Sequence, residues 1–289
     1  MAERVIGFCC PICGGGLTCR GQAAVCPSGH SFDRARQGYY HLLPANKMHS
    51  KIPGDTAEMV QSRRRFLERG YYQDFQKELC KLAAECLQGL PPEQLALEQL
   101  ALEQAVILDA GCGEGYYTGA LRSAFPQALL CGFDISRWAV KAAAGKYKGI
   151  SFAVASSFSI PAPDSFCHLL IDIFSPLAQA EFARVVKPGG YFIYAVPGRR
   201  HLMGLKEILY EQPYENERQD TEYPGFSFVT RREVKKEIFL PDAQTALDLF
   251  AMTPYYWKTG IEGGCRLKET KGFSTEISFD FLIYRKERP

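Results

Sequence analysis

The sequence lacks the features that mark membrane and secreted proteins. No apolar run approaches the roughly 20 residues that a membrane-spanning helix needs, and the N-terminus has no basic segment followed by an apolar segment and a cleavage site. Net charge is also scarce: it is only +2 over 289 residues, so attraction to nucleic acid would have to come from local basic patches. We therefore expect a cytoplasmic protein without a membrane association. A chain of this length is expected to form two folded units.

Cysteine, by contrast, is abundant, and its 11 residues fall into two groups. The clustered group lies near the start of the chain, where Cys10-Pro-Ile-Cys13 precedes Cys26-Pro-Ser-Gly-His30. The scattered group is predicted to be reduced and mostly buried, and it consists of Cys80, Cys86, Cys112, Cys131, Cys167 and Cys265.

Two close pairs of soft ligands, separated by a short hairpin, can surround one tetrahedral Zn²⁺ ion. Four protein ligands leave no position for water, so the metal is predicted to be structural. It would hold residues 1–37 as a module too small for a core of its own. Two alternatives stay open, a register in which Cys9 replaces Cys10 and a redox C-x-x-C motif. The predicted ligands are Cys10, Cys13, Cys26 and His30.

The stretch from Val106 to Thr118 reads Val-Ile-Leu-Asp-Ala-Gly-Cys-Gly-Glu-Gly-Tyr-Tyr-Thr. Apolar residues, an acid and then alternate glycines describe a buried strand that ends in a turn where the backbone approaches a ligand closely. A helical stretch follows, so free N–H groups at its start point at whatever is bound. We therefore predict a cofactor loop that contains Asp109, Gly111, Gly113, Glu114 and Gly115.

The spacing of this loop excludes a dinucleotide site, because Tyr116 occupies the place of the third glycine in the dinucleotide fingerprint. A second acid, Asp134, closes the next predicted strand and suits a ribose diol, since a carboxylate can accept two hydroxyl hydrogen bonds at once. The pattern resembles the class I S-adenosylmethionine (SAM) methyltransferases. The alternative is a glycine turn that only caps a helix.

Strands alternate with helices from residue 105 to about 200, which predicts an α/β fold with a doubly wound, Rossmann-like sheet. The expected strands cover 105–109, 128–134, 150–154, 168–174 and 191–196, and the expected helices cover about 115–124, 136–147 and 178–186.

Ligands of such sheets bind beyond the carboxyl ends of the strands, where Ser156, Ser157 and Asp172 fall. In the class that the pattern resembles, the place of the two serines contacts the adenine. Asp172 is a candidate general base for a guanine N1 proton. The alternative for Asp172 is a strand-end acid with no chemical role.

Residues 38–104 are predicted to form a connector of helices. Asp55 and Glu58 form a capping-box pattern at the start of a helix over 56–69, and Gly70 is placed to end that helix.

Three adjacent arginines, Arg63, Arg64 and Arg65, lie on this helix. Such a run is usually a solvated face, and the alternative is contact with RNA, for which Arg63 and Arg64 are candidates. The following run, 93–104, repeats a five-residue unit whose period matches neither a helix nor a strand, and we assign it no function.

Several ordered motifs narrow the resemblance to one family. They are C-P-x-C with C-P-x-x-x-H, then G-Y-Y-H-L-L-P (38–44), P-G-D-T-A-E-M (53–59), R-R-R-F-L-E-R-G-Y-Y (63–72) and G-C-G-E-G-Y-Y-T (111–118). Together they resemble RlmA, the family of 23S ribosomal RNA guanine-N1 methyltransferases with its macrolide-resistance branch. The resemblance runs from about residue 8 to the C-terminus, interrupted by the repeat.

The resemblance implies SAM as cofactor, 23S rRNA as partner and a homodimer. It implies that residues 105–289 form the methyltransferase domain, with a substrate-side insertion after about 200. It places Tyr72 and His201 at the cofactor, the latter in the loop Pro-Gly-Arg-Arg-His-Leu-Met. Arg199 and Arg200, in the same loop, are candidates for contacts with RNA phosphates.

We therefore predict methyl transfer from SAM to N1 of a guanine in a hairpin loop of 23S rRNA, with the zinc module and the connector helix helping to grip the RNA. The aromatic string 252–257 is predicted either to stack on a base or to pack in the core. Alternating apolar residues over 275–284 predict a final antiparallel strand. Two other functions stay open: methylation of another RNA or a small molecule, and a catalytically inactive RNA-binding protein with this fold.

Overall fold

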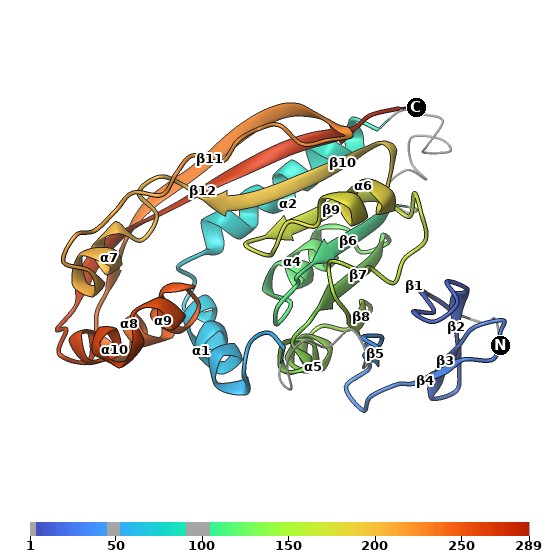
Figure 1. Ribbon diagram of the computed structural model, residues 1–289, viewed down its shortest axis with the longest axis horizontal. Helices are drawn as coiled ribbons and strands as arrows, with labels where there is room; N and C mark the ends of the chain where they lie inside the picture. Colours follow the sequence, from blue (N-terminus) through green and yellow to red (C-terminus); the bar gives the residue numbers. More distant parts are fainter. Residues whose placement is uncertain (1–3, 45–52, 91–104, 289) are drawn as a thin grey trace.

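The computed structural model describes residues 4–44, 53–90 and 105–288. The basic loop within 45–52 and the repeat at 93–104 lie outside the described residues. Within them, the chain forms a small antiparallel sheet at the N-terminus and a large mixed sheet with helices against it (Figure 1). No helix in this part of the chain combines the length and the apolarity needed to cross a membrane.

The large sheet has the strand order β11-β12-β10-β9-β6-β7-β8-β5. The strands from β10 to β5 pair in parallel, whereas β12 pairs antiparallel with β10 and β11. The chain order reverses between β6 and β9, where doubly wound sheets bind ligands at their carboxyl ends, and the predicted fold class is confirmed. The strands are β5 (Tyr40–His41), β6 (Val106–Ala110), β7 (Leu129–Asp134), β8 (Ser151–Val154), β9 (Cys167–Ile173), β10 (Val186–Pro197), β11 (Phe226–Leu240) and β12 (Phe273–Lys286).

The first helix begins one residue later than its capping pattern predicts. Its N-cap is Thr56, whose hydroxyl accepts a hydrogen bond from the Met59 N–H at 3.3 Å, while the Asp55 carboxylate instead pairs with Arg63. Gly70 follows its end with φ +81°, as the C-terminal signal predicts. The helices are α1 (Ala57–Glu68), α2 (Gln73–Gln88), α4 (Tyr116–Ala124), α5 (Arg137–Lys146), α6 (Gln179–Val185), α7 (Met203–Leu209), α8 (Ala243–Ala251), α9 (Tyr255–Lys258) and α10 (Gly260–Lys268).

Two hydrophobic cores lie on opposite faces of the large sheet, because successive side chains of a strand point to opposite faces. Ile107 and Ile171 belong to the core beneath α2, with Leu79 of that helix. The neighbouring Leu108 belongs to the other core, with Phe182 of α6. Burying each such side chain contributes about 1.5–3 kcal/mol, so the sheet is a rigid platform for the loops at its edge.

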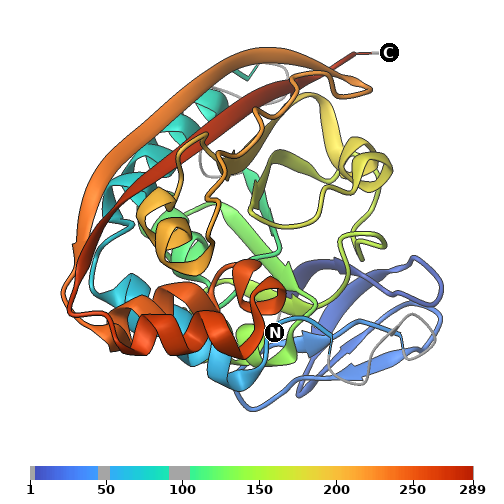
Figure 2. The same cartoon turned by 60° about the vertical axis from the view of Figure 1, so that its left-hand side comes forward.

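The N-terminal sheet consists of β1 (Arg4–Cys9), β2 (Gly16–Arg20), β3 (Ala23–Val25) and β4 (Ser31–Asp33). It packs against the large sheet beside β7, and Ile6 and Phe8 belong to the same core as Phe133 (Figure 2). A Cβ atom on Gly7 would lie 2.5 Å from the Cys131 sulfur, so glycine permits the close approach. The small module therefore shares a core with the large sheet.

β11 and β12 form a long antiparallel ribbon that curves over α2 (Figure 2). β12 is the final antiparallel strand that the sequence predicts. The basic stretch of β11 is neutralised by ion pairs with acids of α2 and β12: Arg231 with Asp280, Arg232 with Glu78, Lys235 with Glu276 and Lys236 with Asp74.

Candidate cofactor site and metal centre

The loop after β6 requires its glycines. Gly111, Gly113 and Gly115 have φ angles of +74°, +55° and +82°, which are strained for residues with a Cβ atom. A Cβ on Gly111 would also lie 2.4 Å from the Cβ of Ser175. The loop is anchored by the backbone N–H groups of Gly111 and Cys112, which donate to the Phe133 carbonyl at 2.9 Å. It leads directly into the N-terminus of α4.

Asp134, at the end of β7, faces this loop. Its carboxylate accepts hydrogen bonds from the Gly113 N–H at 3.0 Å and the Ser136 N–H at 2.7 Å. Burial raises the pKa of Asp134, and the two backbone N–H groups oppose that rise. Each carboxylate oxygen has further acceptor capacity, so this arrangement can also receive the hydroxyl groups of a ribose.

Asp109 has a different environment from Asp134. It is buried, and the Thr118 hydroxyl of α4 donates to its carboxylate at 2.5 Å. Burial raises its pKa to about 7, although the Thr118 hydrogen bond opposes the rise. Asp109 therefore ties the strand before the glycine loop to the helix after it.

Ser156 and Ser157 follow β8, which pairs with β7, so they lie at the same edge of the sheet as Asp134. Both are half-buried. The Ser156 hydroxyl accepts a hydrogen bond from the Phe158 N–H at 3.2 Å, which shapes this turn.

Tyr72 and His201 both contact one aromatic ring, that of Phe279 in β12. The ring centroids are 4.9 Å apart for Tyr72 and 4.8 Å apart for His201. The structure therefore brings the two residues that the family resemblance places at the cofactor into one aromatic cluster.

His201 is neutral in this cluster. Burial, assisted by the charge of Lys206, lowers its pKa to about 3. Its Nδ1 accepts a hydrogen bond from the Ser278 N–H at 3.2 Å, so the ring proton lies on Nε2.

Asp172 lies within β9, where its neighbours Ile171 and Ile173 face the core beneath α2 and its own side chain faces the other core. Its Oδ1 accepts from the Ser175 N–H at 3.0 Å, and Oδ2 has no partner among the described residues. Burial raises its pKa well above the usual value. This environment favours the protonated carboxyl group, whereas a general base must be deprotonated.

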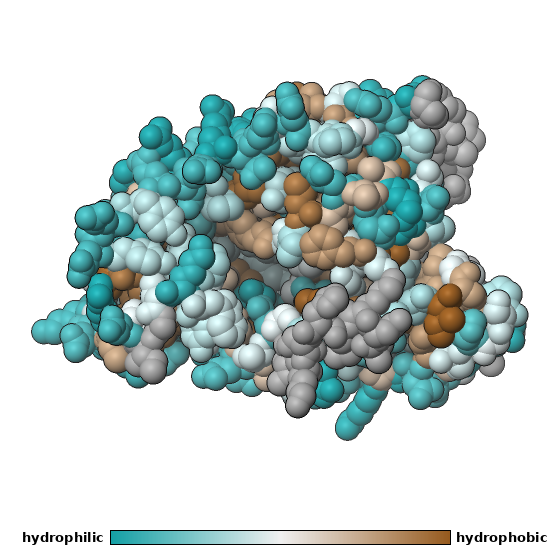
Figure 3. Space-filling model, in the orientation of Figure 1, coloured by the Kyte–Doolittle hydropathy of each residue, from teal (hydrophilic) through white to brown (hydrophobic). Residues whose placement is uncertain are grey.

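Phe174, next along the chain after β9, has a left-handed φ of +57° and is 45% exposed. Its ring contacts those of His201 and Phe279 at centroid distances of 6.0 and 5.3 Å. The face of the molecule seen in Figure 3 is hollowed near its centre and carries hydrophobic side chains around the hollow. The strained backbone and exposed ring of Phe174 therefore lie beside His201, which the family resemblance places at the cofactor.

The three arginines of α1 point in three directions, because successive residues of an α-helix are rotated by about 100°. Arg64 pairs with Glu68 on the surface. Arg65 donates to the buried carboxylate of Asp248 in α8 at 2.6 Å. Arg63 points towards the glycine loop, so the three do not form one basic face.

The remaining arginine candidates and the aromatic string are more exposed. Arg199 and Arg200 both pair with Glu215, and their side chains are 78% and 51% exposed. In the aromatic string Tyr255 is buried, whereas Trp257 is 67% exposed, so its members divide between the core and the surface.

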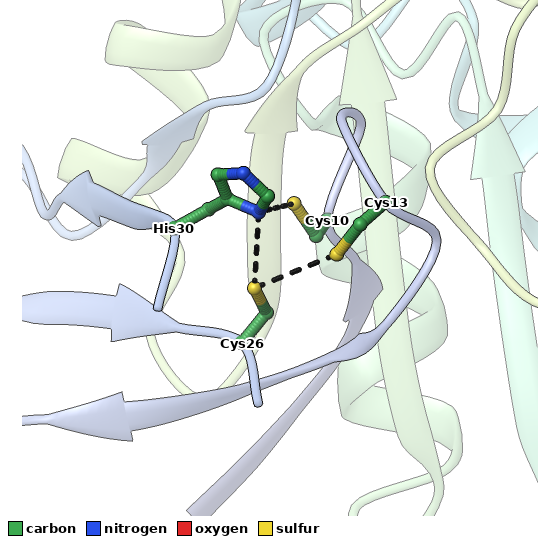
Figure 4. Close-up of side chains that lie close together, drawn as sticks. All are labelled: Cys10, Cys13, Cys26 and His30. Atoms are coloured by element: carbon green, nitrogen blue, oxygen red, sulfur yellow. Dashed lines mark hydrogen bonds between the residues drawn. The ribbon is translucent and has the colours of Figure 1, made fainter. Parts of the chain in front are cut away.

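The four predicted metal ligands converge at one point, with all their ligand atoms within 4.8 Å of one another (Figure 4). The His30 Nδ1 lies 3.5 Å from the Cys10 sulfur and 3.4 Å from the Cys26 sulfur, and the Cys13 and Cys26 sulfurs are 3.6 Å apart. With Zn–S bonds of about 2.3 Å, two sulfur ligands of a tetrahedral ion lie about 3.8 Å apart. The four side chains fit Zn²⁺.

Cys9 does not belong to this cluster, which decides the register that the sequence leaves open. Its backbone N–H donates to the Pro161 carbonyl at 2.7 Å, and burial raises the pKa of its thiol. Backbone hydrogen bonding at Gly15 lowers the pKa of the Cys13 thiol to about 6, as suits a thiolate ligand.

Comparison with known proteins matches both parts of the chain. The family described as "RlmA, N-terminal", a zinc ribbon, matches residues 8–51, and the family described as "Methyltransferase domain" matches residues 107–190. A protein of Micromonospora griseorubida, assigned by its name to 23S rRNA (guanine-N1) methylation, is 35% identical over 205 residues, 69% of this chain and 68% of the relative. The chain belongs to the RlmA family of 23S rRNA (guanine-N1)-methyltransferases.

Two further relatives extend the comparison. A Bacillus subtilis protein of the same designation is 28% identical over 96% of this chain and 97% of its own length. The 23S rRNA (guanine(748)-N(1))-methyltransferase of Streptomyces fradiae is 29% identical over 72% of this chain and 70% of its own length.

For an RlmA-family protein, SAM is the cofactor that the site must accommodate, and the residues fit it. The left-handed glycines let the backbone approach a ligand, the N-terminus of α4 presents its amides, and Asp134 faces the loop with acceptor capacity for a ribose. SAM supplies an activated sulfonium methyl group. The zinc ribbon adds a second, structural cofactor.

Sequence reasoning missed two members of this site. Phe279 lies in a strand that was expected only to close the sheet, and its apolar alternation carries no signal of a central ring. Phe174 does carry a usable signal, because it is an aromatic residue directly after a strand end and two residues beyond the candidate Asp172.

Proposed function

We propose that this chain methylates N1 of a guanine in a hairpin loop of 23S rRNA, with SAM as methyl donor. One observation carries the proposal: a complete four-ligand zinc ribbon and a glycine loop with a ribose-suited acid occur in one chain. The relatives that this chain resembles are named for this reaction. A small substrate would not need the ribbon. We divide the chain into the ribbon (1–37), a connector (38–104) and the methyltransferase domain (105–289).

In this proposal the site aligns the methyl group with N1 and supplies little covalent chemistry. Asp134 and the loop amides hold the ribose, and Ser156 and Ser157 face the adenine. The neutral ring of His201, fixed through Nδ1, presents an N–H donor on its Nε2 beside the cofactor. Tyr72 contacts the same Phe279 ring as His201 and completes the aromatic cluster. Asp109 acts by holding the loop to α4.

We place the target guanine against Phe174. Its exposed ring is available for stacking, which contributes about 1–3 kcal/mol per base in RNA-binding proteins. We expect Phe174→Ala to raise the KM for RNA by about 5–150-fold and to leave the affinity for S-adenosylhomocysteine (SAH) within about threefold. Equal losses for both ligands would show instead that the ring only supports the cofactor site.

The test of the function is a transfer assay with purified protein, labelled SAM and 23S rRNA that lacks the modification. After digestion, mass spectrometry should locate 1-methylguanosine in one hairpin loop. A protein that binds SAM and zinc but methylates a different RNA, a small molecule or nothing would overturn the assignment. Arg199→Ala together with Arg200→Ala should weaken RNA binding without changing zinc content.

We expect the enzyme to act in the cytoplasm. Cysteines stay reduced in that compartment, and the ribosomal substrate is found there. We also propose that it forms a homodimer, as the family resemblance suggests. Light scattering coupled to size-exclusion chromatography would return one chain mass of 32.4 kDa or twice that value.

A further inference from the structure

One arginine of α1 lies inside the cofactor site. The Nη1 atom of Arg63 lies 3.6 Å from the point where a Cβ of Gly113 would be, so its guanidinium lies beside the middle glycine of the loop. Its side chain is 22% exposed, compared with 46% for the adjacent Arg64. An RNA-binding arginine on an open face would not be expected in this position.

The charges around Arg63 are mostly acidic. Burial opposes its charge, but Asp55, Glu114 and Asp134 together raise its pKa. Arg63 in turn opposes the rise in the pKa of the buried Glu114. The guanidinium therefore stays charged at the loop, near carboxylates from the residues before α1, from the glycine loop and from the end of β7.

Arg63 is held in place before any ligand arrives. Its Nη1 donates to the Asp55 carboxylate, and the Asp55 carbonyl accepts from the Ser136 hydroxyl at 2.6 Å. Ser136 is the N-cap of α5 and lies two residues after Asp134, the last residue of β7. Such support fixes the guanidinium relative to the ribose-binding edge and lowers the entropy lost when a ligand binds.

A guanidinium has five N–H donors, and the described residues provide Arg63 with one hydrogen-bonding carboxylate, that of Asp55. The remaining donors suit a second carboxylate, which a planar guanidinium binds through two parallel hydrogen bonds. The cofactor brings one carboxylate, on its methionine part, into a site whose own fixed groups are mainly anionic. That carboxylate needs a cation.

We propose that Arg63 is a positioning residue that binds the carboxylate of the methionine part of SAM and of SAH. The assignment rests on the proposed function, because it takes SAM as the cofactor. It replaces the expectation that Arg63 contacts RNA.

The experiment compares two ligands that differ only in this carboxylate. Titration calorimetry would measure the binding of SAM and of decarboxylated SAM to the wild type, Arg63→Met, Arg63→Lys and the matched control Arg64→Met. No RNA is present, so the result does not depend on which substrate is methylated.

We expect the wild type to prefer SAM over decarboxylated SAM by about 10–100-fold, the range of a charge-assisted hydrogen-bonded pair. Arg63→Met should lose this preference, because its affinity for SAM falls while its affinity for decarboxylated SAM is unchanged. Arg63→Lys should retain part of the preference. Arg64→Met should bind both ligands as the wild type does. Melting temperatures would confirm that the variants fold.

Three results would overturn the proposal. If Arg63→Met weakened the binding of both ligands equally, Arg63 would maintain the shape of the site and would not bind the carboxylate. Unchanged SAM binding with weaker rRNA binding in a filter assay would return Arg63 to RNA contact. A folded wild type that binds neither ligand would sink this inference and the proposed function together, whereas SAM binding without rRNA methylation would sink only the function.

Discussion

The zinc ribbon and the glycine-loop site are built on different physical principles, although they share one chain. The ribbon gathers its four ligand atoms from residues 10–30, in turns between very short strands. The cofactor site gathers groups from α1, β6, β7 and β12, and it rests on a sheet with a core on each face. The first depends on an ion for its local order, and the second depends on packed apolar surface.

Because of this difference, substitutions in the two regions are expected to have different effects. Removing a ligand from the ribbon leaves three polar groups without their common partner, and the few apolar residues that it shares with the large sheet do not replace the ion. Removing a polar group at the glycine loop, such as the Asp134 carboxylate, changes ligand affinity and leaves the sheet folded, because neither apolar core includes that group.

The largest expected effect comes from breaking the ribbon with Cys26→Ser. Structural zinc contributes on the order of 10 kcal/mol to small zinc modules, so we expect loss of bound zinc and fast hydrogen exchange over β1 to β4. Transfer to rRNA should be lost, whereas SAH affinity should stay within about threefold. Elemental analysis, hydrogen exchange and calorimetry would measure these. The control is Cys265→Ser, at an exposed thiol outside the cluster.

Retained zinc in Cys26→Ser, or a parallel loss of SAH affinity, would break the comparison. The second result would mean that the core shared between the ribbon and the large sheet transmits disorder to the glycine loop.

A smaller effect is expected from Asp134→Asn, which preserves shape but replaces one acceptor oxygen with a donor and removes the charge. The variant should bind SAH about 10–100-fold more weakly, the range for losing a charged hydrogen bond. Its zinc content should be unchanged. Asp164→Asn, at a residue whose side chain is 81% exposed, is the control. Unchanged SAH affinity would remove Asp134 from the site.

The smallest expected effect is the pH dependence of the free energy of unfolding that buried His201 causes. The ordinary pKa of His201 is 6.5 and burial lowers it to about 3, so at neutral pH both the folded and the unfolded states hold it neutral. Below pH 6.5 the imidazole of His201 is protonated in the unfolded chain but stays neutral in the folded protein. The free energy of unfolding therefore falls by about 1.4 kcal/mol per pH unit, or about 2 kcal/mol by pH 5.

Urea unfolding at about pH 7.5 and about pH 5 would test this for the wild type and His201→Gln. The variant should lose about 2 kcal/mol less between the two conditions, because it lacks the buried imidazole. Burial also lowers the pKa of His168 to about 4. Its contribution to the pH dependence is the same in both proteins, so it cancels from the difference between them. Equal losses would show that His201 is accessible to protons in the fold.

Much of the fold follows from local sequence patterns. The alternation of strands and helices after residue 105 predicts the doubly wound sheet, and the apolar run near the C-terminus predicts β12. The long partner strand β11 was not predicted, because its many charged residues obscure the alternation of a strand. Those charges are tolerated because acids of α2 and β12 lie opposite them.

The sequence by itself determined the metal set and the glycine loop, because both depend on short spacings. Two pairs of ligands with a hairpin between them can meet at one ion with little help from the rest of the chain, and alternate glycines after an apolar run specify a close backbone approach.

Only the tertiary structure decided which way the arginines of α1 point and which ring joins Tyr72 to His201. Rotation by about 100° per residue sends neighbouring side chains to different partners, which lie just before α1, on α1 itself and in α8. Phe279 likewise acquires its place through the antiparallel return of β12 beside β10. Contacts between residues far apart in the chain depend on packing, which local spacing does not encode.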